Sequence, residues 1–171
     1  MRTFLRRGVF ALLIAGAGCS SGESADPPGS SGAAPGSAAA DACALLTEQQ
    51  IGDIIGSPVV KGRNETGPTT CKWDPQNAGE VDVLLITGAP GSDREKYICP
   101  GLRKTATADP EFAGIGETVT WKFSAVASLF NSGDLELCGR KGYISLSLNG
   151  KRDEPALKQA AISLARTIQE R

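Results

Sequence analysis

An apolar stretch that ends at a cysteine is the feature that most constrains how this chain folds. Three arginines (Arg2, Arg6 and Arg7) come first, residues 8–18 are apolar and small, and Cys19 follows directly. A positive segment, a short apolar segment and small residues before a cut define a secretory signal. The run is too short for a permanent membrane helix, which needs about 20 apolar residues. We therefore expect residues 1–18 to be an export signal, so that the mature domain folds in an oxidising compartment.

The residues just before Cys19 give this signal a more specific interpretation. The triplet Gly16-Ala17-Gly18 resembles a lipobox, the motif that is cut after lipid is attached to the cysteine thiol. It departs from the usual motif at Gly16, where leucine is common. The alternative is an ordinary secretory signal with a chance cysteine. On this resemblance we favour lipidation of Cys19. Two or more acyl chains, palmitate among them, would then anchor the protein stably on the extracytoplasmic face of the cell membrane.

A linker of biased composition follows the cysteine. Of the 22 residues from Ser20 to Asp41, 19 are Ser, Gly, Ala or Pro. Such a segment buries too little apolar surface to offset its chain entropy, so residues 19–41 are expected to be a disordered, lipid-anchored tether. As a flexible coil it would span about 25 Å on average. The globular domain is then expected over residues 42–171.

Charge and histidine content exclude several classes of function. Without the three signal arginines, 15 basic residues face 19 acidic ones, which gives the mature chain a net charge of -4. A nucleic-acid binder normally carries a basic patch or stripe, so no nucleic-acid partner is expected. The chain has no histidine. This removes Ser-His-Asp and Cys-His nucleophile systems and imidazole metal sites.

The domain opens with a strong helix signal. Thr47 and Gln50 have the spacing of a capping box, and Gly56 followed by Pro58 is typical of a helix end. Between them, three isoleucines form one apolar stripe: Ile51, Ile54 and Ile55.

A second helix is expected over residues 93–104, after a glycine-containing turn. The turn, residues 88–93, follows a strand-like run and invites a phosphate-cradle interpretation. It lacks Gly-Lys-Ser/Thr and Gly-x-Gly-x-x-Gly, and Ser92 with Glu95 fits another capping box better. Pro100-Gly101 is expected to kink this helix or end it early.

Strand patterns fill most of the remaining domain. Early strands are predicted at residues 58–63, 69–74 and 80–87. From Gly114 onward the pattern indicates a four-strand meander, with strands near 118–123, 125–130, 135–138 and 143–148 and turns at 131–133 and 139–142. A closing helix starts at Asp153-Glu154-Pro155, and its inward stripe is Leu157, Ala160, Ala161, Leu164 and Ile168. The fold class is therefore α+β: one twisted antiparallel sheet with helices packed against it.

With Cys19 assigned to lipid, four cysteines remain: Cys43, Cys71, Cys99 and Cys138. An even number in an exported domain indicates two disulfides, and three pairings are possible. We favour Cys43–Cys71 and Cys99–Cys138, which would join the first helix to an early strand and the second helix to the meander. A four-thiolate zinc site would show closer cysteine pairs, and a redox site would show Cys-x-x-Cys; neither occurs.

Four short features occur along the domain: Cys43-Ala44-Leu45-Leu46-Thr47, the later Gly56, Cys71-Lys72-Trp73, and Gly114-Ile115-Gly116-Glu117. With these features the chain resembles a family of actinobacterial cell-envelope lipoproteins of unknown function. The resemblance covers roughly residues 41–171. It implies the Cys43–Cys71 pairing and an envelope location. It says nothing of Cys99 and Cys138, and it supplies no catalytic residues.

The sequence contains no recognisable catalytic set. The carboxylates of Asp82, Glu117, Asp134 and Glu136 are scattered, and nothing in the sequence brings two of them together for hydrolysis. Serine-nucleophile signatures and an EF-hand loop are absent. Trp73 and Trp121 fit either a ligand pocket or, as we favour, core positions with partners for the indole N–H.

These observations favour a binding function over catalysis. We expect a non-catalytic module, without cofactor or metal, that binds a small apolar ligand or an envelope protein. One alternative is a structural or accessory subunit of an envelope complex. Another is a hydrolase that uses carboxylates or a serine.

Overall fold

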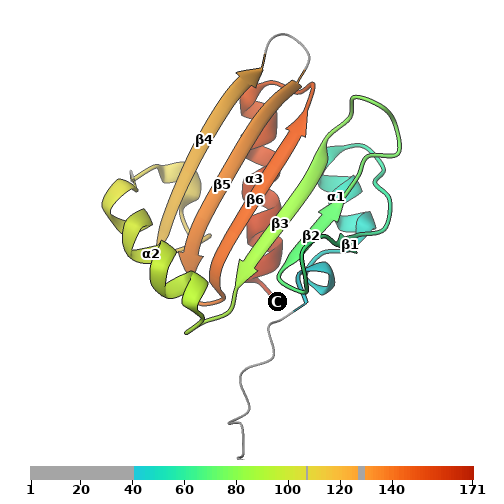
Figure 1. Cartoon of the computed structure of the whole chain (residues 1–171). Coiled ribbons are helices and arrows are strands. Elements are labelled where there is room, and N and C mark those ends of the chain that lie inside the picture. Colours follow the sequence, from blue (N-terminus) through green and yellow to red (C-terminus); the bar gives the residue numbers. More distant parts are fainter. Residues whose placement is uncertain (1–40, 107, 127–129) are drawn as a thin grey trace, which may run out of the picture. The chain divides into compact units, whose positions relative to one another are not determined.

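The computed structural model describes residues 41–106, 108–126 and 130–171. The expected signal peptide, the lipidation site Cys19 and the linker up to residue 40 lie outside the described residues. The described part consists of one six-stranded, fully antiparallel sheet with helices packed against it, which confirms the predicted α+β class. Figure 1 shows this arrangement.

The strands lie in the order β1-β2-β3-β6-β5-β4. Their bounds are β1 Arg63–Asn64, β2 Thr70–Trp73, β3 Asp82–Gly88, β4 Thr118–Val126, β5 Phe130–Gly139 and β6 Gly142–Gly150. The longest ladders join β4 to β5 and β5 to β6, so the C-terminal meander forms one half of the sheet. β3 pairs with β6 and connects the N-terminal strands to that half.

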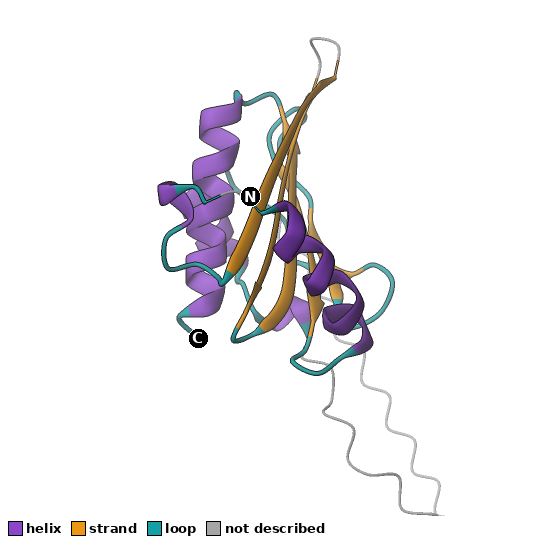
Figure 2. Ribbon diagram, turned by 90° about the vertical axis from the view of Figure 1, so that its left-hand side faces the viewer, coloured by secondary structure: helices purple, strands orange, loops and turns teal. Residues whose placement is uncertain are grey.

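Three α-helices and two short 3₁₀ helices accompany the sheet. Their bounds are η1 Ala42–Ala44, α1 Glu48–Ile55, α2 Asp93–Thr105, η2 Pro110–Phe112 and α3 Glu154–Gln169. α3 packs along β5 and β6 on one face, with α1 beside it, whereas α2 lies on the opposite face (Figure 2). No helix of the described residues has the length and apolar composition required to cross a bilayer.

The main core lies between the sheet and α3. Alternate side chains of the central strands face α3, and each is at most 1% exposed: Val83, Leu85, Leu135, Leu137, Ile144, Leu146 and Leu148. From α3 come the predicted inward residues, together with Ile162 and Ala165. Each fully buried Leu or Ile stabilises the fold by about 1.5–3 kcal/mol. This core therefore dominates the burial energy and fixes the register of the central strands.

The helix ends follow the sequence signals closely. In α1 the Gln50 amide donates to Thr47 Oγ1 at 3.2 Å and the Thr47 amide donates to Gln50 Oε1 at 3.1 Å, which completes the predicted capping box. Gly56 ends the helix in the left-handed region, with φ 67°. Asp153 caps α3 through its side chain, as expected.

The second helix matches its predicted range to within one residue, and it differs from the prediction in that it does not end at Pro100 and has no complete capping box. α2 continues through Pro100 to Thr105, because Cys99 and Leu102 are buried against the sheet and hold its second half in place. Ser92 caps the helix by accepting from the Glu95 amide at 3.3 Å. The Glu95 carboxylate, however, accepts from the Gly91 amide at 2.6 Å, whereas a capping box would direct it to the amide of Ser92.

Two strand predictions are wrong. Residues 58–62 form only an isolated bridge, Val59 to Pro75, and β1 is limited to Arg63–Asn64. The turn predicted at residues 131–133 lies inside β5, so the meander has three strands where four were expected. Gly133 pairs with Phe123 and Leu148 within the sheet, and the Trp121 ring occupies the space that a side chain at Gly133 would need.

Candidate functional site

A small pocket opens at the end of the sheet where β3 ends and the β5–β6 turn lies, which is the lower end of the sheet in Figure 1. Its volume is about 220 Å³. We call it the basal pocket. It is lined by Leu45, Thr69, Thr87, Ala89, Pro90, Arg140, Lys141, Ile144 and Ile168. These residues come from the segment after η1, from the turn before β2, from β3 and β6, from the β3–α2 loop and the β5–β6 turn, and from α3. The fold therefore assembles the pocket from distant parts of the sequence.

The β5–β6 turn shapes one wall of the pocket. Gly139 pairs with Gly142 and closes the predicted turn around Arg140 and Lys141. Gly142 has φ 86°, which favours glycine, and a Cβ there would meet the Gly88 carbonyl oxygen and, at 2.9 Å, the Ala89 carbonyl carbon. Because Gly142 has no side chain, the turn can pack directly against the β3–α2 loop. This packing places Arg140 and Lys141 at the mouth of the pocket.

The β3–α2 loop forms another part of the lining. A hollow of about 290 Å³ adjoins the basal pocket here and shares Thr69, Thr87, Ala89 and Pro90 with it. Arg94 lines this hollow and donates from Nη1 to the Thr87 carbonyl at 3.3 Å. The Thr87 amide donates to the Thr69 carbonyl at 2.8 Å, which ties the ends of β2 and β3 together beneath the pocket.

The polarity of the basal pocket is uneven. Ile144 and Ile168 are 1% exposed, whereas Arg140 and Lys141 are exposed at the mouth. The lining contains no carboxylate. The pocket therefore combines an apolar interior with a cationic rim.

A larger hollow of about 440 Å³ lies along α1, and its mixed lining includes the acidic residues Glu48 and Asp53 beside Pro58 and Val59. It is a broad depression in the surface. Ligand sites are concave and mostly apolar with a few placed polar groups. The basal pocket fits that description better despite its smaller volume.

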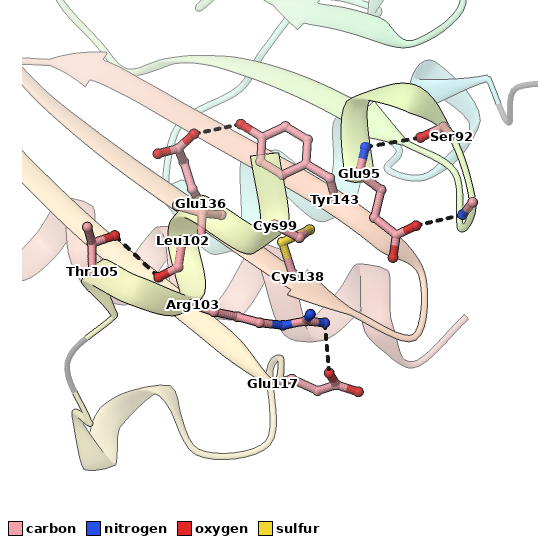
Figure 3. Close-up of a disulfide and its surroundings, with 11 residues drawn as sticks. Ser92, Glu95, Cys99, Leu102, Arg103, Thr105, Glu117, Glu136, Cys138 and Tyr143 are labelled. Carbon is pink, nitrogen blue, oxygen red and sulfur yellow. Dashed lines mark hydrogen bonds and ion pairs between the residues drawn. A yellow bond between two sulfur atoms is a disulfide. The ribbon is translucent and has the colours of Figure 1, made fainter. Parts of the chain in front are cut away.

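The two disulfides have the predicted pairing, Cys43–Cys71 and Cys99–Cys138. Figure 3 shows the second of them between α2 and the end of β5. Together with Leu102 and Tyr143 it forms a small second core under α2. The first joins the segment of η1 to β2, close to Leu45 in the sequence. Both cross-links therefore brace elements that border the base of the sheet.

Tyr143 and Glu136 form a buried polar contact beside the second disulfide. Tyr143 is 4% exposed, and its Oη donates to Glu136 Oε1 at 2.6 Å (Figure 3). Burial, and next the hydrogen bond to the Glu136 carboxylate, raise the pKa of the phenol above its ordinary value. The phenol therefore stays protonated and donates, which is a structural role.

The candidate carboxylates are placed in separate surroundings. Asp82 accepts from Asn149 Nδ2 at 2.9 Å and lies 3.8 Å from Lys72 Nζ. Glu117 lies 3.8 Å from Arg103, at the base of the sheet. Asp134 and Glu136 alternate along β5 on the face that carries α2, as the strand pattern indicates. Asp82 and Glu117 thus each lie beside a cation, the former in β3 and the latter just before β4.

The structure also places the two tryptophans. Trp73 is 1% exposed in the main core. Trp121 is half-buried at its edge and donates from Nε1 to Glu154 Oε1 at 3.1 Å. Neither lines the basal pocket. Over the residues that the structure describes, no three His, Cys, Asp or Glu side chains cluster in a way that could hold a metal ion.

The residues of the basal pocket were not among the sequence candidates. Arg140 and Lys141 were interpreted only as turn residues, and Ile144 and Ile168 have the pattern of ordinary core positions. The one available signal was two adjacent cations at a hairpin turn. Comparison of the chain with protein-family models, with curated proteins and with solved structures gives no match.

Proposed function

We propose that this chain is a lipoprotein, anchored through lipid on Cys19 at the extracytoplasmic face of the membrane, whose domain is a non-catalytic binding module for a small apolar ligand. The observation that carries the proposal is the basal pocket, with its buried isoleucines and its few polar groups at the mouth. This combination is typical of small-molecule sites.

The size of the pocket limits the ligand. Its volume of about 220 Å³ lies below the roughly 300 Å³ at which ordinary ligand pockets begin. A single short alkyl chain or a small ring system fits this description, whereas a two-chain lipid does not.

Binding is tested by thermal unfolding in the presence of octanol, a neutral probe with one short chain. A ligand that binds only the folded state stabilises it by about 2.7 kcal/mol when its concentration is about 100 times Kd. We expect the unfolding midpoint of the wild type to rise with octanol concentration. No rise at any soluble concentration would contradict the proposal.

Two variants separate binding in the basal pocket from nonspecific effects. Ala89 is half-buried and lines the pocket, so Ala89→Leu should fill part of the space and reduce the octanol-dependent shift. Ala78 is exposed in the loop before β3, so Ala78→Leu adds the same atoms elsewhere and should leave the shift unchanged. Equal shifts in the two variants would place the binding outside the pocket.

The anchor is supported by the sequence around Cys19 and by the resemblance to envelope lipoproteins. We expect the wild type to fractionate with membranes and Cys19→Ala to appear in the soluble fraction. If Cys19→Ala stays with the membranes as much as the wild type does, the anchor is contradicted. The binding proposal does not depend on this result, because the octanol experiment tests it.

A further inference from the structure

We infer that the ligand of the basal pocket is a single-chain amphiphile with an anionic headgroup. This inference rests on the proposed function, because it names the chemical class of the molecule that the pocket would bind. Arg140 and Lys141 are adjacent in the β5–β6 turn, and both line the mouth of the pocket.

The two cations have no counter-charge of their own. Within the described ranges, neither side chain takes part in an ion pair. Some other cations of the domain do: Lys158 contacts Asp109 at 2.8 Å and Glu111 at 2.6 Å, and Lys72 contacts Asp74 at 3.0 Å. Arg140 and Lys141 are therefore available to an incoming anion.

The order of polarity along the pocket matches that of an amphiphile. The charged residues are exposed at the mouth, and the aliphatic residues Ile144 and Ile168 are 1% exposed. A ligand that placed an alkyl chain against the isoleucines would bring its head to the cations. Hydrogen bonds between a guanidinium or ammonium group and a carboxylate or phosphate are shorter and stronger than neutral ones.

The hairpin fixes these cations with respect to the apolar interior. Gly142 packs against the Gly88 carbonyl, so the turn cannot swing away without breaking its contact with the β3–α2 loop. Ile144 follows Lys141 by three residues on β6, and Ile168 belongs to α3, which packs along that strand. The charged and apolar parts of the site are therefore held on one rigid substructure.

Isothermal titration calorimetry with matched single-chain probes tests the inference. Octanoate, octanol and octylamine share the chain and differ in the charge of the head. We expect the wild type to bind octanoate roughly tenfold more tightly than octanol, as expected for hydrogen bonds to charged groups. Octylamine should bind most weakly, and added salt should reduce the preference for octanoate.

Charge-removing variants assign this preference to the two residues. In Arg140→Gln/Lys141→Gln the ratio of octanoate affinity to octanol affinity should fall from about ten to about one. Lys96→Gln/Lys104→Gln removes the same charge from exposed positions on α2 outside the pocket and should keep the preference. Loss of the preference in both double variants would overturn the inference, because it would trace the effect to net charge.

The remaining outcomes distinguish this inference from the proposed function. If octanol and octanoate bind equally, the inference fails and the proposed function stands. If no probe binds, the proposed function fails. If the wild type ignores free octanoate and binds vesicles of anionic phospholipid through Arg140 and Lys141, the cations serve membrane attachment, and the inference is overturned.

Discussion

At the scale of single residues, Gly142 and Gly101 have opposite surroundings. Gly142 has a positive φ and lies against the Gly88 carbonyl, whereas Gly101 lies in α2 with no atom close to the position of an added Cβ. Strain of this kind costs about 1–3 kcal/mol. We expect Gly142→Ala to lower the free energy of unfolding by at least that amount in urea titrations.

The matched control is Gly101→Ala, which should raise the free energy of unfolding by about 0.5–1 kcal/mol, because alanine is the better helix former. Gly142→Ala should also weaken binding of octanol, since the turn that it displaces forms a pocket wall. Equal stabilities of Gly142→Ala and wild type would show that the turn does not depend on this packing.

Asp74 gives the domain a pH dependence that can be measured. Its carboxylate accepts a hydrogen bond from the Arg63 guanidinium, and its Oδ1 lies 3.0 Å from Lys72 Nζ. The hydrogen bond from Arg63, and next that from Lys72, hold the pKa of Asp74 below its ordinary 3.8. Because the folded pKa is the lower one, the carboxylate stabilises the fold above pH 3.8, and this contribution is lost as the pH falls through the folded pKa.

We therefore expect Asp74→Asn to be less stable than wild type at about pH 7, by at most about 1 kcal/mol since the network is partly exposed. The gap should close as the pH falls to about 2–3. Urea titrations over a pH series measure this difference in the free energy of unfolding. Asp134→Asn is the control, because Asp134 forms no ion pair within the described residues. A gap that widens toward acid would contradict the assigned role of Asp74.

At the scale of elements, α2 depends on its cross-link. It meets the opposite face of the sheet from α3 through a small cluster of Cys99, Leu102, Cys138 and Tyr143. Without the disulfide, little apolar burial holds it. We expect Cys99→Ala/Cys138→Ala to lower the free energy of unfolding by about 2–4 kcal/mol and to speed hydrogen exchange throughout α2, with α3 remaining protected.

The other disulfide supplies the control for this experiment. Cys43→Ala/Cys71→Ala removes a cross-link of comparable loop length, 28 residues against 39, and should leave exchange in α2 unchanged. If exchange in α2 stays slow without Cys99 and Cys138, the helix is held by packing alone.

The elements also show where local sequence signals suffice. Caps such as Thr47 and Asp153 act within one helical turn, so the sequence predicts them correctly. Asn131, Ser132 and Gly133 carry a turn signal, but the structure places them in β5, where they pair with β4 and β6 and the ring of Trp121 covers Gly133. That contact joins neighbouring strands, and a local pattern contains no information about it.

At the scale of the whole molecule, the fold class follows from the sequence, but the basal pocket does not. Alternation and capping signals predict the antiparallel sheet and α3, and the even cysteine count of an exported domain indicates the two disulfides. The pocket brings Leu45 and Ile168 to the same place as Lys141, across more than 120 residues of chain. Such a juxtaposition depends on strand order and on how helices pack against the sheet, which the chain's local patterns leave open.

The central claim, that the basal pocket binds a small apolar ligand, is tested most directly by methyl NMR spectra of isoleucine-labelled protein titrated with octanol. The account predicts saturable shifts of the Ile144 and Ile168 methyl signals, while those of Ile51 and Ile55 in α1, which lie outside the pocket, stay in place. Unchanged Ile144 and Ile168 signals, or shifts spread equally over all the isoleucines, would contradict it.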